Sequence, residues 1–329
     1  MALKQNASIM AKFIIAICLS LIFVPLGLAS DCTETSIGET PLNDLPTQLY
    51  EGYTGGLYPN EQNELPPAHL ALGLARAAEI TPINGKIVLL SIGVSNTSTE
   101  FQRFQQLAAA YPDKNPALVM VNGAQGSKPL PRWLTVWIVK TGRRGTRTTL
   151  TQVYQEIDKR LVAAGVTRSQ VQAVWFKLPD RLANQPFPDA WLTHAEQTRK
   201  VLRNLKMLYP NVKLVFLTSR IYGGYSTNSN HVEPDAYQHG FAYKWVIESQ
   251  IDGTGNLNAD PALGPVIAPW VGWGPYLWAD GLIPRSDGLT WACSDFRSDG
   301  VHPAPSGADK IATRLLDFFK TSPLTTWFN

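Results

Sequence analysis

From residue 86 onward, short runs of apolar and β-branched residues alternate with longer segments whose apolar residues recur at helical spacing. The predicted strands are 86–92, 117–121, 171–176 and 212–218. The predicted helices are 98–111, 153–164, 190–209 and 308–319. Strands that alternate with helices form a parallel sheet with helices on its faces. We therefore expect an α/β fold, a three-layer α/β/α sandwich with a mostly parallel central sheet.

The first 29 residues have the features of a secretory signal peptide. Lys4 and Lys12 precede an apolar run over 13–29, which ends in the small-residue pattern Gly27-Leu28-Ala29. A basic start, a short apolar stretch and such an ending are typical of export signals. A membrane anchor is the alternative, although the run is short for a spanning helix and contains Pro25. We expect cleavage, a secreted or periplasmic protein, and no membrane association afterwards.

Residues 30–329 are expected to form a single domain, which is a large but acceptable size for an α/β enzyme. Residues 30–85 are predicted to form an N-terminal arm that lies over the core, because the first part of this segment is rich in Pro, Gly, Asn and Glu without a clear period. Residues 222–295 are rich in Gly, Pro and aromatic residues. We interpret this stretch as an elaboration near the functional site.

The charge balance argues against nucleic acid as a partner. The chain has 29 basic and 26 acidic residues, a net charge of +3, and loss of Lys4 and Lys12 with the signal leaves +1. One basic run is interrupted by glycines, and we interpret it as a solvated loop. It consists of Lys140, Arg143, Arg144 and Arg147. The chain has no CxxC pattern and no Cys/His cluster, so we expect no metal site.

Two cysteines, Cys32 and Cys293, remain after the signal is removed. Export to an oxidising compartment makes a disulfide between them plausible. It would join the N-terminal arm to the segment just before Asp299. The alternative is two unpaired thiols; we favour the disulfide because no other pair is available.

Ser95 is the candidate nucleophile. It lies in Gly93-Val94-Ser95-Asn96-Thr97, directly after the first predicted strand. A serine in such a turn lies at the carboxyl edge of the sheet, with its own backbone N–H available to bind an oxyanion. The alternative is a polar turn that caps the next helix. The segment is not a Gly-x-Ser-x-Gly elbow, because Thr97 replaces the second glycine.

His302 is the candidate general base. It follows Asp299 and Gly300 in a turn before the last helix. A neutral imidazole can take the proton of a serine hydroxyl, and a carboxylate can fix its tautomer. The alternative for this turn is a polar loop that caps the helix. The other histidines suit catalysis less: two lie in helical or pre-helical sequence and two in a polar loop. They are His69, His194, His231 and His239.

These segments resemble the sequence blocks of the SGNH (GDSL-like) hydrolase superfamily, over residues 86–319. Gly93-Val94-Ser95 is similar to its Gly-Asp-Ser block, with Val in place of Asp. Gly123-Ala124-Gln125-Gly126 is similar to its glycine-containing turn after the second strand. Residues 299–303 match its Asp-x-x-His-Pro block fully.

The resemblance implies a flavodoxin-like sheet and a set of roles. Ser95 would be the nucleophile and the first oxyanion donor, and Gly123 the second donor. His302 would be the general base and Asp299 the residue that orients it. No metal or organic cofactor is needed for this chemistry.

One block of the family is missing. Its members have Gly-x-Asn-Asp after the third strand, where the Asn side chain is a further oxyanion donor. Here the third strand leads into Phe176-Lys177-Leu178-Pro179-Asp180. Lys177 is either a charged substitute for that Asn or a salt-bridge residue, and the sequence does not favour one over the other.

The expected function is that of a secreted serine esterase that hydrolyses carboxylic esters through an acyl-enzyme intermediate. A small-molecule or polysaccharide ester is the expected substrate, with removal of acetyl groups from a polysaccharide preferred over a lipid or short-chain ester. Trp273 and Tyr276 are candidate substrate-binding residues, although aromatic residues also suit a hydrophobic core. The alternative function is a catalytically impaired carbohydrate-binding protein on the same fold, suggested by the missing Asn and by Val94.

Overall fold

The computed structural model describes residues 30–45, 49–142, 145–180, 182, 185–229 and 231–329. The predicted signal peptide, residues 1–29, lies outside the described residues. Among the described residues, no helix combines the length and the apolar character needed to cross a membrane.

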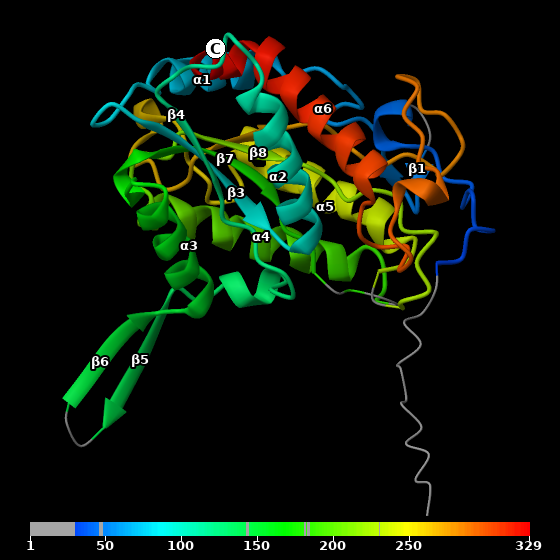
Figure 1. Cartoon of the computed structure of the whole chain (residues 1–329), viewed down its shortest axis with the longest axis horizontal. Helices are drawn as coiled ribbons and strands as arrows, with labels where there is room; N and C mark the ends of the chain where they lie inside the picture. Colours follow the sequence, from blue (N-terminus) through cyan, green and yellow to red (C-terminus); the bar gives the residue numbers. More distant parts are fainter. Residues whose placement is uncertain (1–29, 46–48, 143–144, 181, 183–184, 230) are drawn as a thin grey trace, which may run out of the picture.

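A five-stranded parallel sheet forms the centre of the molecule (Figure 1). Its strands are β3 (Ile87–Gly93), β4 (Leu118–Asn122), β7 (Val171–Lys177), β8 (Leu214–Leu217) and β9 (Trp270–Trp273). Their order across the sheet is β4-β3-β7-β8-β9. Counted along the chain, this is the 2-1-3-4-5 order of flavodoxin-like sheets. The predicted α/β fold is therefore confirmed.

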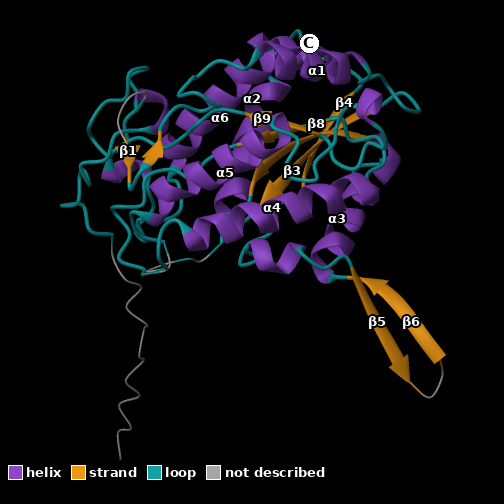
Figure 2. Cartoon of the chain, turned by 180° about the vertical axis from the view of Figure 1, so that it is seen from behind, coloured by secondary structure: helices purple, strands orange, loops and turns teal. Residues whose placement is uncertain are grey.

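Helices cover both faces of the sheet, which completes the three layers (Figures 1 and 2). On one face lie α1 (Pro67–Ala78), α2 (Ser95–Ala109) and α6 (Pro305–Thr321). On the other lie α3 (Gln152–Ala163), α4 (Asp189–Leu208) and α5 (Asp235–Ile251). Short 3-10 helices occur at Leu42–Asp44, Leu130–Trp133, Arg168–Gln170, Pro261–Leu263, Cys293–Asp295 and Pro323–Phe328.

The burial of the strands explains why they could be recognised in the sequence. Every residue of β3, β7, β8 and β9 is buried, so these strands are covered on both faces and consist mainly of apolar residues. The edge strand β4 is only partly buried. The core therefore lies between this sheet and the two helix layers.

Several elements were not predicted. The arm 30–85 contains β1 (Leu49–Tyr50), β2 (Tyr53–Thr54) and the helix α1, so it is not extended throughout. The elaborated region 222–295 contains α5 and β9. In α5, 13 of the 17 residues are buried, polar ones included. A helix without a solvent-facing side has no apolar period, which is why it escaped prediction.

The basic run is a β-hairpin, which corrects the prediction of a loop. It consists of β5 (Trp137–Gly142) and β6 (Gly145–Leu150), paired antiparallel from Trp137↔Leu150 to Gly142↔Gly145. Both views show the hairpin projecting away from the body (Figures 1 and 2). Residues 143–144 at its tip lie outside the described residues.

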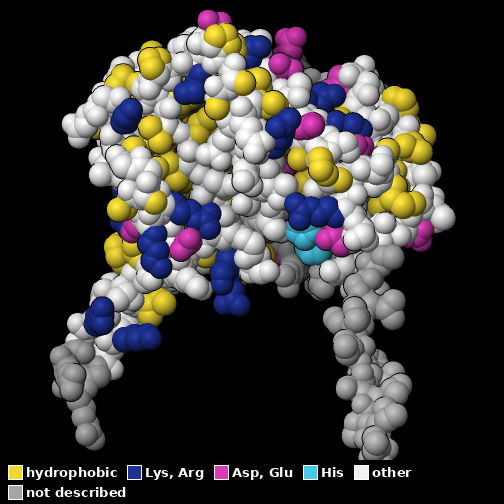
Figure 3. Space-filling model, viewed as in Figure 1, with side chains coloured by type: hydrophobic (Ala, Val, Ile, Leu, Met, Phe, Trp, Pro, Cys, Tyr) yellow, Lys and Arg dark blue, Asp and Glu magenta, His cyan; other side chains and the backbone are white. Residues whose placement is uncertain are grey.

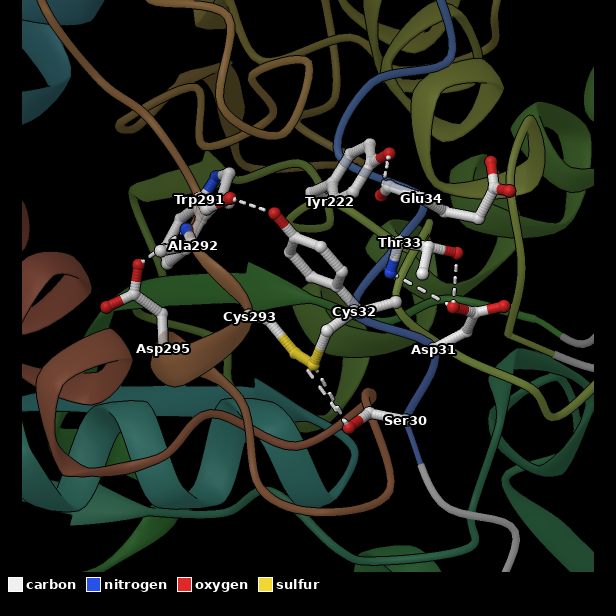
Figure 4. The surroundings of a disulfide bond; sticks show 11 residues. Ser30, Asp31, Cys32, Thr33, Glu34, Tyr222, Trp291, Ala292, Cys293 and Asp295 are labelled. Carbon is white, nitrogen blue, oxygen red and sulfur yellow. Dashed lines mark hydrogen bonds between the residues drawn. A yellow bond between two sulfur atoms is a disulfide. The ribbon is translucent and has the colours of Figure 1, made fainter.

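The structure contains the disulfide between Cys32 and Cys293, whose Cα atoms are 5.4 Å apart (Figure 4). The backbone on either side of Cys32 is held as well. Ser30 N–H donates to the carbonyl oxygen of Ser298 at 2.7 Å, and Asp31 N–H donates to that of Tyr225 at 2.9 Å. The start of the arm is thus fixed against the loop that leads to Asp299.

Candidate active site

Ser95 is the first residue of α2 and follows β3 after a single intervening residue. The strand order reverses between β3 and its neighbours β4 and β7, which is where ligands bind in such sheets. Gly93 makes the tight turn possible, because a Cβ at this position would overlap Thr97 Oγ1 and the carbonyl oxygen of Lys177. The sequence therefore presents the Ser95 hydroxyl at the carboxyl edge of the sheet.

Ser95, His302 and Asp299 form a continuous hydrogen-bonded chain. His302 Nε2 lies 2.8 Å from Ser95 Oγ, and His302 Nδ1 lies 2.6 Å from Asp299 Oδ2. The neighbouring Asn96 side chain donates to the carbonyl oxygen of Val301 at 2.9 Å, which ties the start of α2 to the histidine loop. With Nδ1–H donated to Asp299, Nε2 is the acceptor for the serine proton.

The turn that carries Asp299 and His302 is shaped by backbone hydrogen bonds. Asp299 Oδ1 accepts from the amides of Val301 and His302 at 2.9 and 3.0 Å. Gly300 has a φ of +65°, and a Cβ there would overlap the carbonyl oxygen of Tyr225. Glycine is thus required both for the backbone conformation and for the close approach.

The surroundings of Asp299 favour the ionised form of its carboxyl group. Partial burial alone would raise its pKa, but the amides of His302 and Val301 and the His302 side chain lower the pKa overall. The side chains of His302 and Asp299 are 31% and 44% exposed, so solvent can reach the pair. An ionised carboxylate here favours the positive charge that His302 gains when it takes a proton.

The predicted second oxyanion donor, Gly123, is wrongly placed for that role. Its N–H donates to Ser91 Oγ at 3.2 Å. The other glycine of the same turn, Gly126, lies beside Ser95: a Cβ built on it would be 3.7 Å from Ser95 Cβ. The turn is held by Gln125 N–H, which donates to the carbonyl oxygen of Gly93 at 2.9 Å. Within the described part of the chain, the Gly126 amide has no hydrogen-bond acceptor.

Lys177 forms a buried salt bridge, which decides between its two predicted roles. Its Nζ lies 2.7 Å from Glu100 Oε1, and both side chains are almost fully buried. Burial lowers the pKa of Lys177, while the Glu100 carboxylate opposes this shift. Lys177 lines a small cavity beside Ser95, but its ammonium group is directed to Glu100. It is therefore a poor substitute for the missing Asn.

Two cavities meet at Ser95. The larger, about 280 Å³, is lined by residues that include Ser127, Pro129, Asp180 and His302. The smaller, about 40 Å³, is lined by residues that include Lys177 and Arg220. Val94, Ser95, Pro179 and His231 line both. A larger cavity of about 480 Å³ lies elsewhere, between α1 and residues 250–263, and contains no triad residue.

Sequence reasoning missed several residues of this cleft. The sequence indicates only a polar loop around His231, yet this residue lines both cavities. Arg220 follows β8, and its position at a strand end was the one available signal. Its Nη1 atom is buried without a hydrogen-bond partner among the described residues. Ser127 and Pro129 follow the turn after β4, where position at the sheet edge was again the signal.

Trp273 and Tyr276 do not contribute to the cleft, which corrects their prediction as substrate-binding residues. Each is only 5% exposed, and neither lines a cavity at Ser95. Trp273 Nε1 donates to the carbonyl oxygen of Leu57 at 2.6 Å, and Tyr276 Oη accepts from Leu42 N–H at 3.3 Å. Both side chains anchor the N-terminal arm to the core.

Three further histidines are buried structural residues. His69 Nε2 lies 2.8 Å from the carbonyl oxygen of Val271. Burial lowers the pKa of His194 to about 3 and also lowers the pKa of His239, which lies in α5 rather than in a loop. These side chains are therefore neutral and do not compete with His302 for the role of base.

The described residues contain no group of three or more His, Cys, Asp or Glu side chains arranged to hold a metal ion. Compared with known proteins, the sequence matches no family model and has no significant match among curated proteins.

Proposed function

We propose that this protein is a serine esterase that hydrolyses carboxylic esters, with Ser95 as nucleophile, His302 as general base and Asp299 as the residue that orients it. The observation that carries the proposal is the chain of two hydrogen bonds, 2.8 Å from Ser95 Oγ to His302 Nε2 and 2.6 Å from His302 Nδ1 to Asp299 Oδ2. The resemblance to SGNH hydrolases assigns the same roles to these residues.

In the acylation step, His302 Nε2 takes the Ser95 hydroxyl proton while Ser95 Oγ attacks the ester carbonyl carbon. The backbone amides of Ser95 and Gly126 stabilise the oxyanion; each such donor is typically worth about 3 kcal/mol of the barrier. The amide of Ser95 also belongs to the first turn of α2, where the helix dipole favours negative charge. His302 then gives its proton to the departing alkoxide, and the alcohol leaves.

In the deacylation step, His302 takes a proton from a water molecule, whose oxygen attacks the acyl carbon. The ester bond to Ser95 Oγ breaks, the proton returns to Ser95, and the carboxylic acid is released. The residues of this chain suffice for both steps.

The two cavities suggest which part of the ester lies on each side of Ser95. His302 must reach the leaving oxygen, and it lines the larger cavity only. The alcohol therefore occupies the cavity of about 280 Å³, and the acyl group that of about 40 Å³. The smaller space suits an acetyl group, since one water molecule needs about 10–15 Å³ by this measure. This arrangement favours removal of acetyl groups from a larger alcohol such as a polysaccharide.

Export is part of the proposal. The basic start and apolar run of residues 1–29 predict a signal peptide, and the disulfide between Cys32 and Cys293 is of the kind that persists outside the cytoplasm. We therefore place the esterase in a secreted or periplasmic location.

The proposal is tested by turnover of p-nitrophenyl esters. Wild-type protein should hydrolyse the acetate and lose activity steeply with the octanoate, whose acyl chain exceeds the small cavity. Ser95→Ala should reduce kcat by about 10⁴-fold or more, because the nucleophile is lost. Ser306→Ala, which removes an exposed hydroxyl at the start of α6, serves as the matched control and should keep full activity.

Equal turnover by wild type and Ser95→Ala would refute the esterase assignment. Absence of any ester turnover, together with retained binding of polysaccharide, would support the alternative of a carbohydrate-binding protein.

A further inference from the structure

The hairpin of β5 and β6 belongs to a part of the chain with an unusual charge pattern. Residues 114–155 contain no Asp or Glu. The same segment contains seven basic residues: Lys114, Lys128, Arg132, Lys140, Arg143, Arg144 and Arg147. The next acidic residue, Glu156, is already paired with Lys159 and Arg160. A segment of one sign within a nearly neutral protein favours a partner of the opposite sign.

The stem of the hairpin has one basic face. Lys140 and Arg147 lie directly opposite each other on the paired strands, both exposed. Neither makes an ion pair with any described residue. Like charges in opposed positions destabilise a strand pair, and a two-stranded hairpin alone is only marginally stable. An anionic ligand on this face would relieve the repulsion.

A groove lies between the hairpin and the catalytic cleft in the order of the chain. Ile138, on the same face of the hairpin as Lys140, lines a groove of about 350 Å³ together with Lys128 and Arg132. The residues next to Lys128 in the chain, Ser127 and Pro129, line the larger cavity at Ser95. Cleft, groove and hairpin are therefore consecutive along one short segment. Lys and Arg side chains occur on the hairpin stem and along the adjoining edge of the body (Figure 3).

The segment that joins cleft and groove is held firmly. Leu130 N–H donates to the carbonyl oxygen of Pro179, a cleft residue, at 3.1 Å. Trp133 Nε1 donates to the carbonyl oxygen of Lys128 at 2.9 Å, and Tyr154 Oη donates to that of Trp133 at 2.6 Å. The groove therefore has a fixed position relative to Ser95, as a subsite for an extended substrate requires.

We propose that the groove and the basic face of the hairpin bind an acidic polysaccharide, and so deliver an acylated anionic sugar polymer to Ser95. This inference rests on the proposed esterase function. The alcohol side of the ester lies in the larger cavity, which Ser127 and Pro129 line, and the rest of the polymer follows this segment to the hairpin. Asp180, an acidic residue, lines the cleft itself and disfavours anionic groups there. The anionic groups of the polymer therefore lie on the hairpin side.

Other anionic partners fit the observations less well. Nucleic acid has no carboxylic ester for the triad to hydrolyse. A membrane would require apolar residues at the hairpin tip, but the tip sequence is Gly142-Arg143-Arg144-Gly145. The exposed apolar side chains lie in the half of β5 nearer the body: Trp137 is 45% and Val139 is 62% exposed.

The test measures binding of the Ser95→Ala protein to polygalacturonate, with amylose as a neutral polymer and phosphatidylglycerol vesicles as an anionic surface. We expect binding to polygalacturonate only, weakened by added salt. The double variant Lys140→Glu/Arg147→Glu should lower the affinity by about tenfold or more. Lys86→Glu/Lys200→Glu, an equal change of charge at exposed sites outside the hairpin, is the matched control and should bind normally.

Equal affinities of the two double variants, or a preference for vesicles over polygalacturonate, would overturn the inference. The milder Lys140→Gln/Arg147→Gln variant controls for misfolding. Its unfolding midpoint should equal that of Ser95→Ala, so that a loss of binding cannot be due to a loss of folded protein. The ester assay on wild-type protein separates the two proposals. Turnover that depends on Ser95, without binding of polygalacturonate, would leave the esterase standing and remove only the anionic substrate.

Discussion

At the residue scale, the proposed mechanism requires Asp299 to be ionised and His302 to be neutral before it takes the Ser95 proton. The Asp299 carboxylate accepts hydrogen bonds from two amides and from the imidazole. These contacts lower its pKa overall, so it remains charged in acid that would neutralise an ordinary carboxyl. The charged Asp299 carboxylate therefore favours the imidazolium that His302 becomes when it takes a proton.

Acidification from about pH 8 to pH 5 should slow ester hydrolysis, because a protonated His302 cannot accept the Ser95 proton. Because its pKa is lowered, Asp299 itself should add no ionisation to kcat/KM over this range. The measurement is the pH profile of kcat/KM for p-nitrophenyl acetate. A rate that stays constant over the whole range would contradict the role of His302.

The position of the second oxyanion donor also depends on contacts between single residues. The sequence identified the turn after the second strand, but it contains two glycines. Which amide faces Ser95 depends on how the chain leaves β4. The Ser91 hydroxyl on the adjacent strand accepts the Gly123 N–H, and Gln125 binds the backbone of Gly93. Such contacts between neighbouring strands cannot be read from the turn itself.

At the scale of elements, the strands and helices that could be predicted are those with a strong local pattern in the sequence. The strands β3 and β7 and the helices flanking them were found to within a few residues, because buried strands are continuously apolar. Helix α5 and strand β9 were missed, since α5 is buried almost all round and β9 is a four-residue strand in an aromatic stretch. The hairpin was missed because neither strand alternates apolar and polar residues: β5 begins with Trp137, Ile138 and Val139 in succession, and β6 consists mainly of Thr, Gly and Arg.

The Cys32→Ser variant tests how the arm is held. The disulfide closes a sequence separation of 261 residues, and its loss should lower the free energy of unfolding by about 2–4 kcal/mol. Denaturant titration measures this change. Dithiothreitol should destabilise wild type to the same extent and leave Cys32→Ser unchanged. Free-thiol labelling of both cysteines in the oxidised wild type would rule the disulfide out.

At the scale of the whole molecule, the parallel sheet brings the site together. Ser95 follows β3 and Gly126 lies after β4, while Asp299 and His302 precede α6, about 200 residues further along the chain. The flavodoxin-like strand order places β3 between β4 and β7, so the ends of these strands meet at Ser95. The order of the motifs along the chain predicts that Ser95, Asp299 and His302 meet. The two cavities at Ser95 and the groove beside the hairpin could not be predicted, because residues from several separate segments line them only in the folded chain.

The most direct test of the account is to identify the residue that reacts as the nucleophile. A fluorophosphonate probe should form a covalent adduct with the native protein, and peptide mapping by mass spectrometry should place the adduct on Ser95 alone. Denatured protein, in which His302 no longer contacts Ser95, should not react. An adduct on any other serine, or no adduct with the native protein, would contradict the central claim.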